Sequence, residues 1–283
     1  MHSRLTILAA FAVFLAFAGL TPDDLHSRRG VAEQPATISA ERVQPPAATR
    51  DTAITLLGEP TVKLSPSAVA VESALSALGG QISRSSHPHA LRYALQGYFR
   101  YKSENPEKVR KPYFYFVDFG LDNLTPRGYV FDMENLSIVR GPFTVAHGHG
   151  SAVGGAGIPT RFLNRKGSNA TSLGLYLAQE TYNFRGRSGG RAYRSIGLRL
   201  QGLSGSFNSA ARERGIVVHG APYVTARRAG RSEGCPAMEL DLARQLIPMI
   251  ADGGLVFHFS PADERWMRDD PWAADASRFA YAE

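Results

Sequence analysis

The chain of 283 residues contains one cysteine, Cys235, and a histidine sixteen residues before it, His219. A thiol becomes a strong nucleophile when it loses its proton, and a nearby imidazole is the usual group that accepts that proton. A lone cysteine has two ordinary roles, since it is either a small buried hydrophobe or a thiol kept for its reactivity. The residues around Cys235 favour the reactive role.

The segment 215–238 reads GIVVHGAPYVTARRAGRSEGCPAM and contains both residues. An apolar, β-branched strand is expected to end at His219, where the backbone holds the imidazole in a fixed position. Beyond a loop rich in glycine and arginine, Gly234 allows the turn before Cys235 to bring backbone N–H groups close to a ligand. The N–H groups of Gly234 and Cys235 can then stabilise a developing oxyanion. The pattern predicts catalysis by a Cys235 nucleophile with His219 as its general base.

Short strands and a few helices are expected to position this segment. The expected strands are rich in β-branched and aromatic residues and cover 113–118, 128–132, 142–147, 172–176, 196–200, 215–219 and 254–259. The expected helices cover 68–78, 89–101, 208–214 and 239–251, with Pro248 counting against a regular last helix. Many strands with few helices predict a mostly-β, sandwich- or barrel-like domain with a short N-terminal helical cap. A parallel α/β fold would need regular helices between the strands, and the sequence lacks them.

The amino-terminal part has the composition of an export signal followed by a linker. A basic start and an uncharged apolar run predict a signal peptide over residues 1–18, with an uncleaved membrane anchor as the alternative. Residues 19–65 are rich in Ala, Pro, Thr, Arg and Glu and predict a disordered linker. A helical segment at 66–105, a catalytic domain at 111–262 and a tail at 263–283 are expected to follow. The predicted location is the periplasm or cell envelope of a bacterium.

The formal net charge is +7, from 32 Lys and Arg against 25 Asp and Glu, which favours an anionic partner such as a cell-wall polymer or a membrane surface. The scattered basic residues form no nucleic-acid motif, so nucleic acid is not an expected partner. Four histidines lack the spacing of a known metal motif: His147, His149, His219 and His258. We predict neither a metal nor another cofactor, and the oligomeric state stays open.

His219-Gly220 and, after the loop, Ser232-Glu-Gly-Cys235 resemble the histidine–glycine and Ser-His-Gly-Cys signature of L,D-transpeptidases with a YkuD-type catalytic domain. The segments HGAPYV and GRSEGCPA are similar to the murein L,D-transpeptidase branch of that family. The resemblance covers residues 113–260, with further familiar segments at 117–119, 147–151, 172–176 and 198–203 and at Asn164.

The resemblance implies a β-rich sandwich and a mechanism that passes through an acyl-enzyme. Cys235 would attack the substrate and His219 would take the thiol proton, with the backbone carbonyl of Gly220 orienting the imidazole. Ser232 and Gly234 would shape the loop and the oxyanion hole. The third residue of a peptidoglycan tetrapeptide stem would acylate the cysteine and release D-alanine, and the amine of a neighbouring stem would accept the acyl group.

Two positions depart from the signature. Glu233 stands where the wider family has histidine, and its negative charge by itself disfavours a thiolate. Pro236-Ala237 replaces the apolar–arginine pair that commonly follows the cysteine. Arg231 and Arg199 are the candidates to take over the role of that arginine.

Three functions stay open at this point. Peptidoglycan transpeptidation is favoured, an L,D-carboxypeptidase or endopeptidase with the same acyl-enzyme is the first alternative, and a non-catalytic wall-binding protein is the second. The intact pair of Cys235 and His219 argues against the last of these. The first two share every step up to deacylation, so the residues do not separate them. The side chains expected in the substrate cleft are Tyr223, Arg231, His147, Ser172 and Tyr176.

Overall fold

The computed structural model describes residues 65–152 and 157–274. The predicted signal peptide and the predicted linker up to residue 64 lie outside these residues, so both stay predictions. Within the described ranges, no helix has the length and apolar character needed to cross a bilayer.

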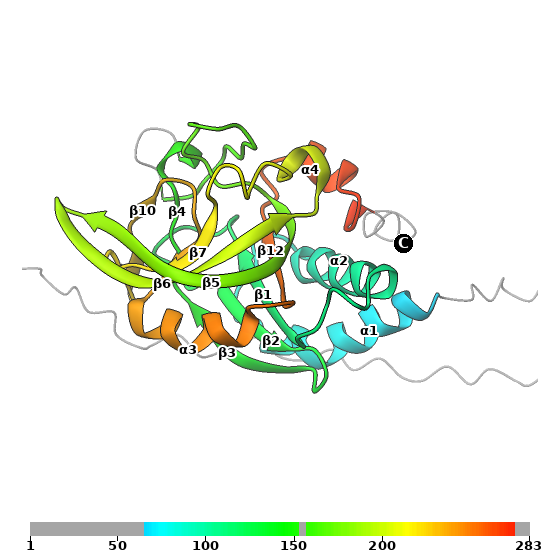
Figure 1. Ribbon diagram of the computed structural model, residues 1–283. Helices are drawn as coiled ribbons and strands as arrows, with labels where there is room; N and C mark the ends of the chain where they lie inside the picture. The colour runs from blue at the N-terminus through cyan, green and yellow to red at the C-terminus, as the bar shows by residue number, and fades with distance from the viewer. Residues whose placement is uncertain (1–64, 153–156, 275–283) are drawn as a thin grey trace, which may run out of the picture. The chain divides into compact units, whose positions relative to one another are not determined.

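Eight strands form one mixed sheet in the order β11-β7-β6-β5-β12-β1-β2-β3 (Figure 1). The strands are β1 (Tyr113–Asp118), β2 (Gly128–Asp132), β3 (Ser137–Phe143), β5 (Gly174–Ser188), β6 (Arg191–Gly202), β7 (Val217–Gly220), β11 (Ala237–Met238) and β12 (Leu255–Phe259). The pairs β1–β12 and β7–β11 are parallel and the other neighbours are antiparallel. The mostly-β prediction is confirmed.

Two small sheets lie next to the large one. Strand β4 (His147–Gly148) pairs in parallel with β10 (Arg231–Ser232), and β8 (Val224–Thr225) pairs with β9 (Arg228–Ala229). Short 3-10 helices are η1 (Gly79–Gln81), η2 (His149–Ser151) and η4 (Gly205–Phe207). The β4–β10 pair connects the glycine-rich 147–151 stretch to the segment that leads into Cys235.

The two faces of the large sheet build two apolar cores because side chains alternate along each strand. On β1, Phe114 and Phe116 join the core that α1 (Pro66–Leu78) and α2 (Ala90–Glu104) cover. Tyr115 and Val117 join the opposite core, which α3 (Leu240–Ile250) covers. The predicted helices at 68–78, 89–101 and 239–251 are confirmed, and the first two pack directly on the sheet.

Some expected elements differ from the structure. Residues 208–214 form turns and not a helix, because the Asn208 side chain is bonded to backbone at Ser204 and Leu175 and the segment is too short to offset helix nucleation. The expected strand 142–147 divides, since the chain leaves β3 after Phe143, forms a single bridge from Ala146 to Ala237 and enters β4 at His147.

The expected tail from residue 263 is folded as far as residue 274. It contains α4 (Glu264–Asp269), whose first turn is capped by the Asp263 side chain accepting from the Trp266 N–H at 3.0 Å. Trp266 is fully buried in the core next to α2 and donates its indole N–H to Asp270. The strands β5 and β6 are also much longer than expected, and their hairpin curves beyond the rest of the sheet (Figure 1).

The segment between the two N-terminal helices is tied to the end of β1. The Asp118 carboxylate accepts hydrogen bonds from the Ser86 N–H at 2.8 Å, the Ser86 hydroxyl at 2.5 Å and the Gly120 N–H at 3.1 Å. Burial raises the pKa of Asp118 despite these bonds, which lower it. The backbone at Gly120 therefore runs in close contact with Ser86.

We predict that Gly120→Ala destabilises the fold by about 1–3 kcal/mol, the usual cost of overpacking. A Cβ at this position would overlap the Ser86 hydroxyl and stand 2.5 Å from Cδ of Pro261. Gly79→Ala is the matched control, because no atom lies within 4 Å of the added Cβ and the backbone there is right-handed helical. Urea unfolding should show a lower midpoint for the first variant and an unchanged or higher one for the second; equal midpoints for both would contradict the packing.

Candidate active site

His219 lies on β7 between two neighbours in the sheet. It pairs with Gly197 of β6 on one side and with Ala237 of β11 on the other. Its backbone N–H donates to the carbonyl of Pro236 at 3.4 Å. Because Pro236 follows Cys235 directly, this ladder fixes the backbone that carries the thiol beside the backbone that carries the imidazole.

The His219 ring is held by one hydrogen bond and one stacking contact. Its Nδ1 lies 3.0 Å from the Gly220 carbonyl oxygen, the contact that the resemblance implied. Since a carbonyl only accepts, Nδ1 carries the proton and the lone pair is left on Nε2. The ring stacks on Phe184 of β5 with centroids 4.1 Å apart and planes 14° from parallel. Burial lowers the pKa of His219 to about 4, so the imidazole is neutral and ready to accept a proton.

Gly220 leaves no space for a side chain next to this contact. A Cβ there would stand 2.7 Å from Oγ of Ser195 and 2.8 Å from Cβ of Ala243 on α3. The Gly220 N–H also donates to the Ser195 hydroxyl at 3.0 Å. The carbonyl that orients the imidazole is thus fixed by β6 and by the helix behind it.

Cys235 is half-buried, and its sulfur lies 3.7 Å from the Gly215 carbonyl oxygen. Burial raises the pKa of the thiol to about 11, while a hydrogen bond from the Val217 N–H and the charge of Arg214 lower it and Glu233 raises it. With these pKa values, the Cys235 thiol and the His219 imidazole, whose pKa is about 4, are both uncharged at neutral pH. If Cys235 acts as a nucleophile, its proton must therefore leave during the attack and not before it.

The loop from Ser232 to Cys235 is closed by one hydroxyl. Ser232 Oγ donates to the Cys235 carbonyl at 2.6 Å and accepts from the Gly234 N–H at 3.2 Å. Gly234 has a φ of +120°, which side chains rarely adopt. The Gly234 N–H is thus occupied within the loop and not free for an oxyanion as expected. Across residues 65–152 and 157–274, the Cys235 N–H has no hydrogen-bond acceptor.

The fully buried His147 belongs to β4, the strand that pairs with β10 at the start of this loop. It lies opposite Arg231 in the β4–β10 pair, and its Nδ1 accepts from the Arg127 guanidinium at 2.8 Å. Burial, Arg127 and Arg231 lower the pKa of His147 to about 3. Its Nε2 is buried with no partner among the described residues. His147 is therefore a buried residue that links Arg127 to the β4–β10 pair, next to the segment that leads into Cys235.

Gly148 allows the close approach of the two segments. Its N–H donates to the Thr171 hydroxyl at 3.0 Å, and that hydroxyl donates to the Gly234 carbonyl at 3.2 Å. A Cβ on Gly148 would overlap the Asn169 carbonyl and stand 2.6 Å from the Gly234 Cα. The geometry of the loop from Ser232 to Cys235 thus depends on Gly148 and Thr171, two residues that are far from it in sequence.

Arg214 is an arginine whose positive charge lowers the pKa of the Cys235 thiol. The sequence offered Arg231 and Arg199 as substitutes for the arginine that commonly follows the cysteine. The Arg214 guanidinium donates to the Ala170 carbonyl at 2.6 Å and to the Ser172 hydroxyl at 2.7 Å, besides contacts at Leu163 and Ser168. Arg199 instead lies over the Tyr182 ring and pairs with Glu180. Arg214 follows a segment that was expected to be a helix, so its position was not visible from the sequence.

The five predicted cleft residues divide into two groups. Tyr223 is half-buried and meets Tyr193 of β6 edge-on, with ring centroids 6.5 Å apart, and Arg231 is also half-buried. His147, Ser172 and Tyr176 are fully buried, and the Tyr176 hydroxyl donates to the Ser172 carbonyl at 2.8 Å. The burial of these three residues argues against the predicted contact with substrate.

An aromatic wall formed by Tyr182, Phe184 and Tyr193 of the β5–β6 hairpin is the main feature that sequence reasoning missed. Tyr182 and Phe184 lie with ring centroids 6.2 Å apart, and Phe184 and Tyr193 6.0 Å apart. Burial raises the pKa of Tyr182 and of Tyr193. Phe184, in the middle of this wall, stacks on the His219 ring. The alternation of aromatic residues over 182–184 was the available signal.

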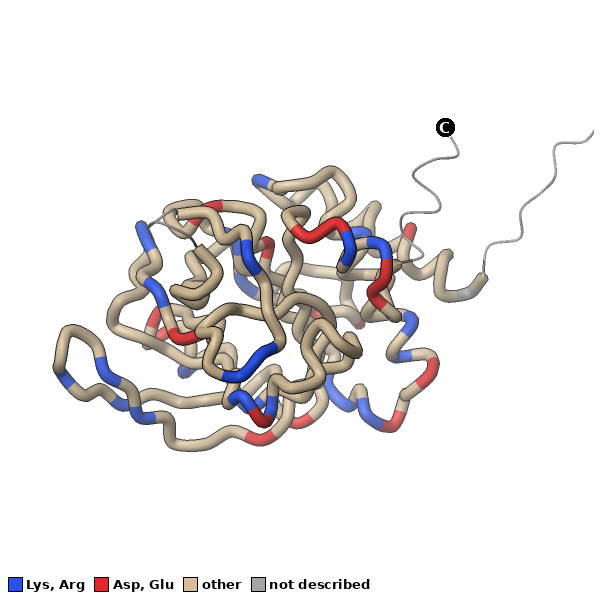
Figure 2. Tube along the Cα trace, turned by 90° about the horizontal axis from the view of Figure 1, so that it is seen from above, with Lys and Arg blue, Asp and Glu red and all other residues tan. Residues whose placement is uncertain are grey.

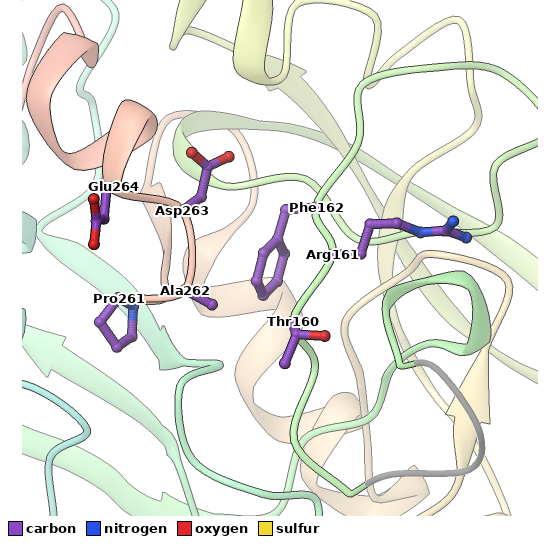
Figure 3. Close-up of a pocket in the computed structure, with 7 residues that line it drawn as sticks. All are labelled: Thr160, Arg161, Phe162, Pro261, Ala262, Asp263 and Glu264. Carbon is purple, nitrogen blue, oxygen red and sulfur yellow. The ribbon is translucent and has the colours of Figure 1, made fainter.

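The described residues gather no group of three or more side chains that could hold a metal. His258 is buried between Phe119 and Tyr176 and bonded to the Ser172 carbonyl, while Nδ1 of His149 lies 3.1 Å from the Ser232 carbonyl oxygen. A hollow of about 580 Å³ lies elsewhere, between residues 160–162 and 261–264 (Figure 3). It is lined by no thiol or imidazole, so it contains none of the predicted catalytic residues.

The three buried histidines predict that stability falls in acid. Burial holds the pKa of His147 at about 3 and those of His219 and His258 at about 4, whereas unfolded histidine titrates near 6.5. Below about pH 6.5 the unfolded chain binds protons that the native chain does not. Each histidine should then cost about 1.4 kcal/mol of unfolding free energy per pH unit until its native pKa is reached.

Urea unfolding at pH 7, 6 and 5 measures this loss, with His258→Gln as the variant that removes one of the three titrations. The variant should show a shallower fall than the parent over the same pH range. The raised pKa values of Asp118 and Asp270 oppose the loss only where those carboxyls titrate, at the acid end. A stability independent of pH between 7 and 5 would contradict the neutral burial of the imidazoles.

The profile of a family described as "L,D-transpeptidase catalytic domain" matches residues 83–259. The match covers more than half of the chain and runs from before α2 to the end of β12, with His219 and Cys235 inside it. No curated protein sequence matches the chain.

Three solved structures show what the chain is similar to. An L,D-transpeptidase from Mycobacterium smegmatis is 15% identical over 53% of this chain and 59% of that one, with a TM-score of 0.33. An L,D-transpeptidase from Stackebrandtia nassauensis is 14% identical over 68% and 78%, with a TM-score of 0.33. Bd1075 from Bdellovibrio bacteriovorus is 18% identical over 60% and 56%, with a TM-score of 0.33. The chain spans less than two thirds of the length of the first and third, and these likenesses carry no argument about activity.

Proposed function

The chain belongs to the family of L,D-transpeptidase catalytic domains, and on that basis we propose that it crosslinks peptidoglycan stem peptides through an acyl-enzyme on Cys235. The observation that supports this most directly is the pairing of β7 with β11, which carries an oriented, neutral His219 beside the Cys235 backbone. The proposed location is the cell envelope, where this substrate occurs.

Acylation begins when the Cys235 sulfur attacks the carbonyl carbon of the third residue of a donor tetrapeptide. The thiol proton passes to Nε2 of His219, and the Cys235 N–H stabilises the oxyanion of the tetrahedral intermediate. The bond to D-alanine then breaks, and His219 returns its proton to the leaving amine. A thioester on Cys235 and free D-alanine result.

Deacylation transfers the acyl group to an amine of a neighbouring stem. The amine attacks the thioester carbon and gives a proton to His219 while the bond to sulfur breaks, and the proton then returns to the Cys235 sulfur. An L,D-carboxypeptidase would use water at this step and release the tripeptide. The wall of Tyr182, Phe184 and Tyr193 and the β8–β9 hairpin beside Tyr223 favour transfer, because these bulky side chains, with Phe184 stacked on the His219 ring, limit the access of water to the proposed base.

The nucleophile and base are tested with a carbapenem, which acylates enzymes of this family. Intact-protein mass spectrometry should show one adduct that Cys235→Ala abolishes together with turnover. His219→Ala should slow acylation by about 10²–10⁴-fold, the usual contribution of a general base. His89→Ala, which removes an imidazole at the start of α2, is the control and should acylate at the parent rate.

The pH dependence checks the state of the base. Acylation requires a neutral His219, so its rate should stay level as pH falls from 8 to 5 and decline only as pH passes through the His219 pKa of about 4. Circular dichroism at each pH identifies the range in which the fold is intact. A half-maximal rate near pH 6.5 would show that burial does not hold the imidazole neutral.

The choice between transfer and hydrolysis is read from products. Purified disaccharide-tetrapeptide should give a crosslinked dimer as the main product when acceptor stems are abundant, because a bound amine reaches effective concentrations far above that of water. Phe184→Ala and Tyr193→Ala should shift the product toward tripeptide by opening the wall, with Gly79→Ala as the unchanged control. Tripeptide as the sole product at saturating acceptor would make the protein a carboxypeptidase.

A further inference from the structure

The outer half of the β5–β6 hairpin is strongly cationic. The sequence contains no Asp or Glu from Thr181 to Arg212, and the hairpin carries four exposed arginines in that stretch: Arg185, Arg187, Arg191 and Arg194. The hairpin projects beyond the sheet, and its tip is blue without red in Figure 2. We call residues 185–194 the arginine arm.

The strand register places like charges against one another. Arg185 and Arg194 are directly opposite in the antiparallel pair, and Arg187 follows two residues on along the same face. Like charges opposite each other destabilise a sheet. Among the described residues, none of the four arginines forms an ion pair, and the nearest carboxylate along the hairpin, Glu180, is bonded to Arg199 and Arg212 instead. An anion bound across the arm would relieve this repulsion.

The arm is continuous with the catalytic site. Phe184, directly before Arg185, stacks on the His219 ring, and Tyr193, directly before Arg194, belongs to the same aromatic wall. The alternation along both strands turns these aromatic side chains toward the catalytic side and turns Arg185, Arg187 and Arg194 to the opposite side. A hollow of about 520 Å³ lies there, lined in part by Asn183, Arg194 and Arg244 of α3.

We propose that the arginine arm binds carboxylate groups of peptidoglycan stem peptides and so anchors the polymer on the hairpin whose other face carries the aromatic wall; this rests on the proposed function. Guanidinium groups match carboxylates with two parallel hydrogen bonds, which suits a polymer that presents many carboxylates. The tip reads Ser-Gly-Gly at 188–190 and presents no apolar side chain for insertion into a bilayer, which favours the polymer over a lipid surface.

The test is co-sedimentation of the full chain with purified peptidoglycan sacculi at low and high salt. The variant R185Q/R187Q/R194Q should bind at least about tenfold more weakly at low salt, because attraction between exposed charges is lost. The matched control R84Q/K111Q/R265Q removes three exposed charges elsewhere and should bind like the parent. Sacculi with chemically amidated carboxyls should reduce binding of the parent to the level of the arm variant.

Several results would contradict the proposed role of the arginine arm. These are parent-like binding by the arm variant, an equal loss in the matched control, or unchanged binding to amidated sacculi. Phosphatidylglycerol vesicles that bind the parent more tightly than sacculi do, with that binding lost in the arm variant, would assign the arm to a membrane instead.

Carbapenem acylation separates this proposal from the proposed function, since a small ligand at Cys235 does not need the arm. The arm variant should be acylated at the parent rate. If the parent binds sacculi through the arm but is never acylated, the proposed binding site stands and the proposed enzymatic function is wrong.

Discussion

The geometry of the loop from Ser232 to Cys235 depends on the buried guanidinium of Arg127. This guanidinium donates to the Val145 carbonyl from Nε at 3.1 Å and from a terminal nitrogen at 2.7 Å, and also to the Leu121 carbonyl. The same group donates to Nδ1 of His147 and lies 4.9 Å from the centre of the Phe119 ring. One side chain thus satisfies the backbone that leaves the sheet after β3 and orients the imidazole beneath β10. Removing a buried charged donor would leave these carbonyls without partners, which costs more than the net value of the bonds themselves.

The proposed catalytic pair of His219 and Cys235 depends on burial as much as on contact. Stacking on Phe184 and the bond to the Gly220 carbonyl fix the His219 ring, but the same enclosure holds the pKa of the imidazole at about 4 and raises that of the Cys235 thiol to about 11. Arg214 opposes the second effect more strongly than Glu233 adds to it, since Glu233 is exposed to solvent and its charge is screened. The glutamate that replaces the family's histidine is therefore compatible with a reactive thiol.

The sequence was most informative where local pattern and chemistry coincide. The β-branched run before His219 and the glycine before Cys235 were enough to predict the strand and the turn but not the pairing of β7 with β11, and the aromatic residues of β1 predicted a core strand. Burial set by distant segments was not accessible in this way. Ser172 and Tyr176 look like cleft residues from their segment, yet β12 and the 208–214 turns enclose them. The extent of β5 and β6 was equally hidden, because glycines and arginines over 185–194 have low strand propensity and only the tertiary pairing extends the ladder.

The β5–β6 hairpin is energetically costly, and the proposed binding role gives a reason for the protein to retain it. A protruding two-stranded ribbon with opposed arginines contributes little to the core and carries internal repulsion, so folding stability alone gives no reason for it. Its root is different, because Phe184 stacks on His219 and Tyr193 continues the aromatic wall toward Tyr223. A polymer bound along the arm would thus be anchored on the same hairpin that stacks Phe184 on the His219 ring, which reduces the loss of entropy that bringing a flexible substrate to the site otherwise requires.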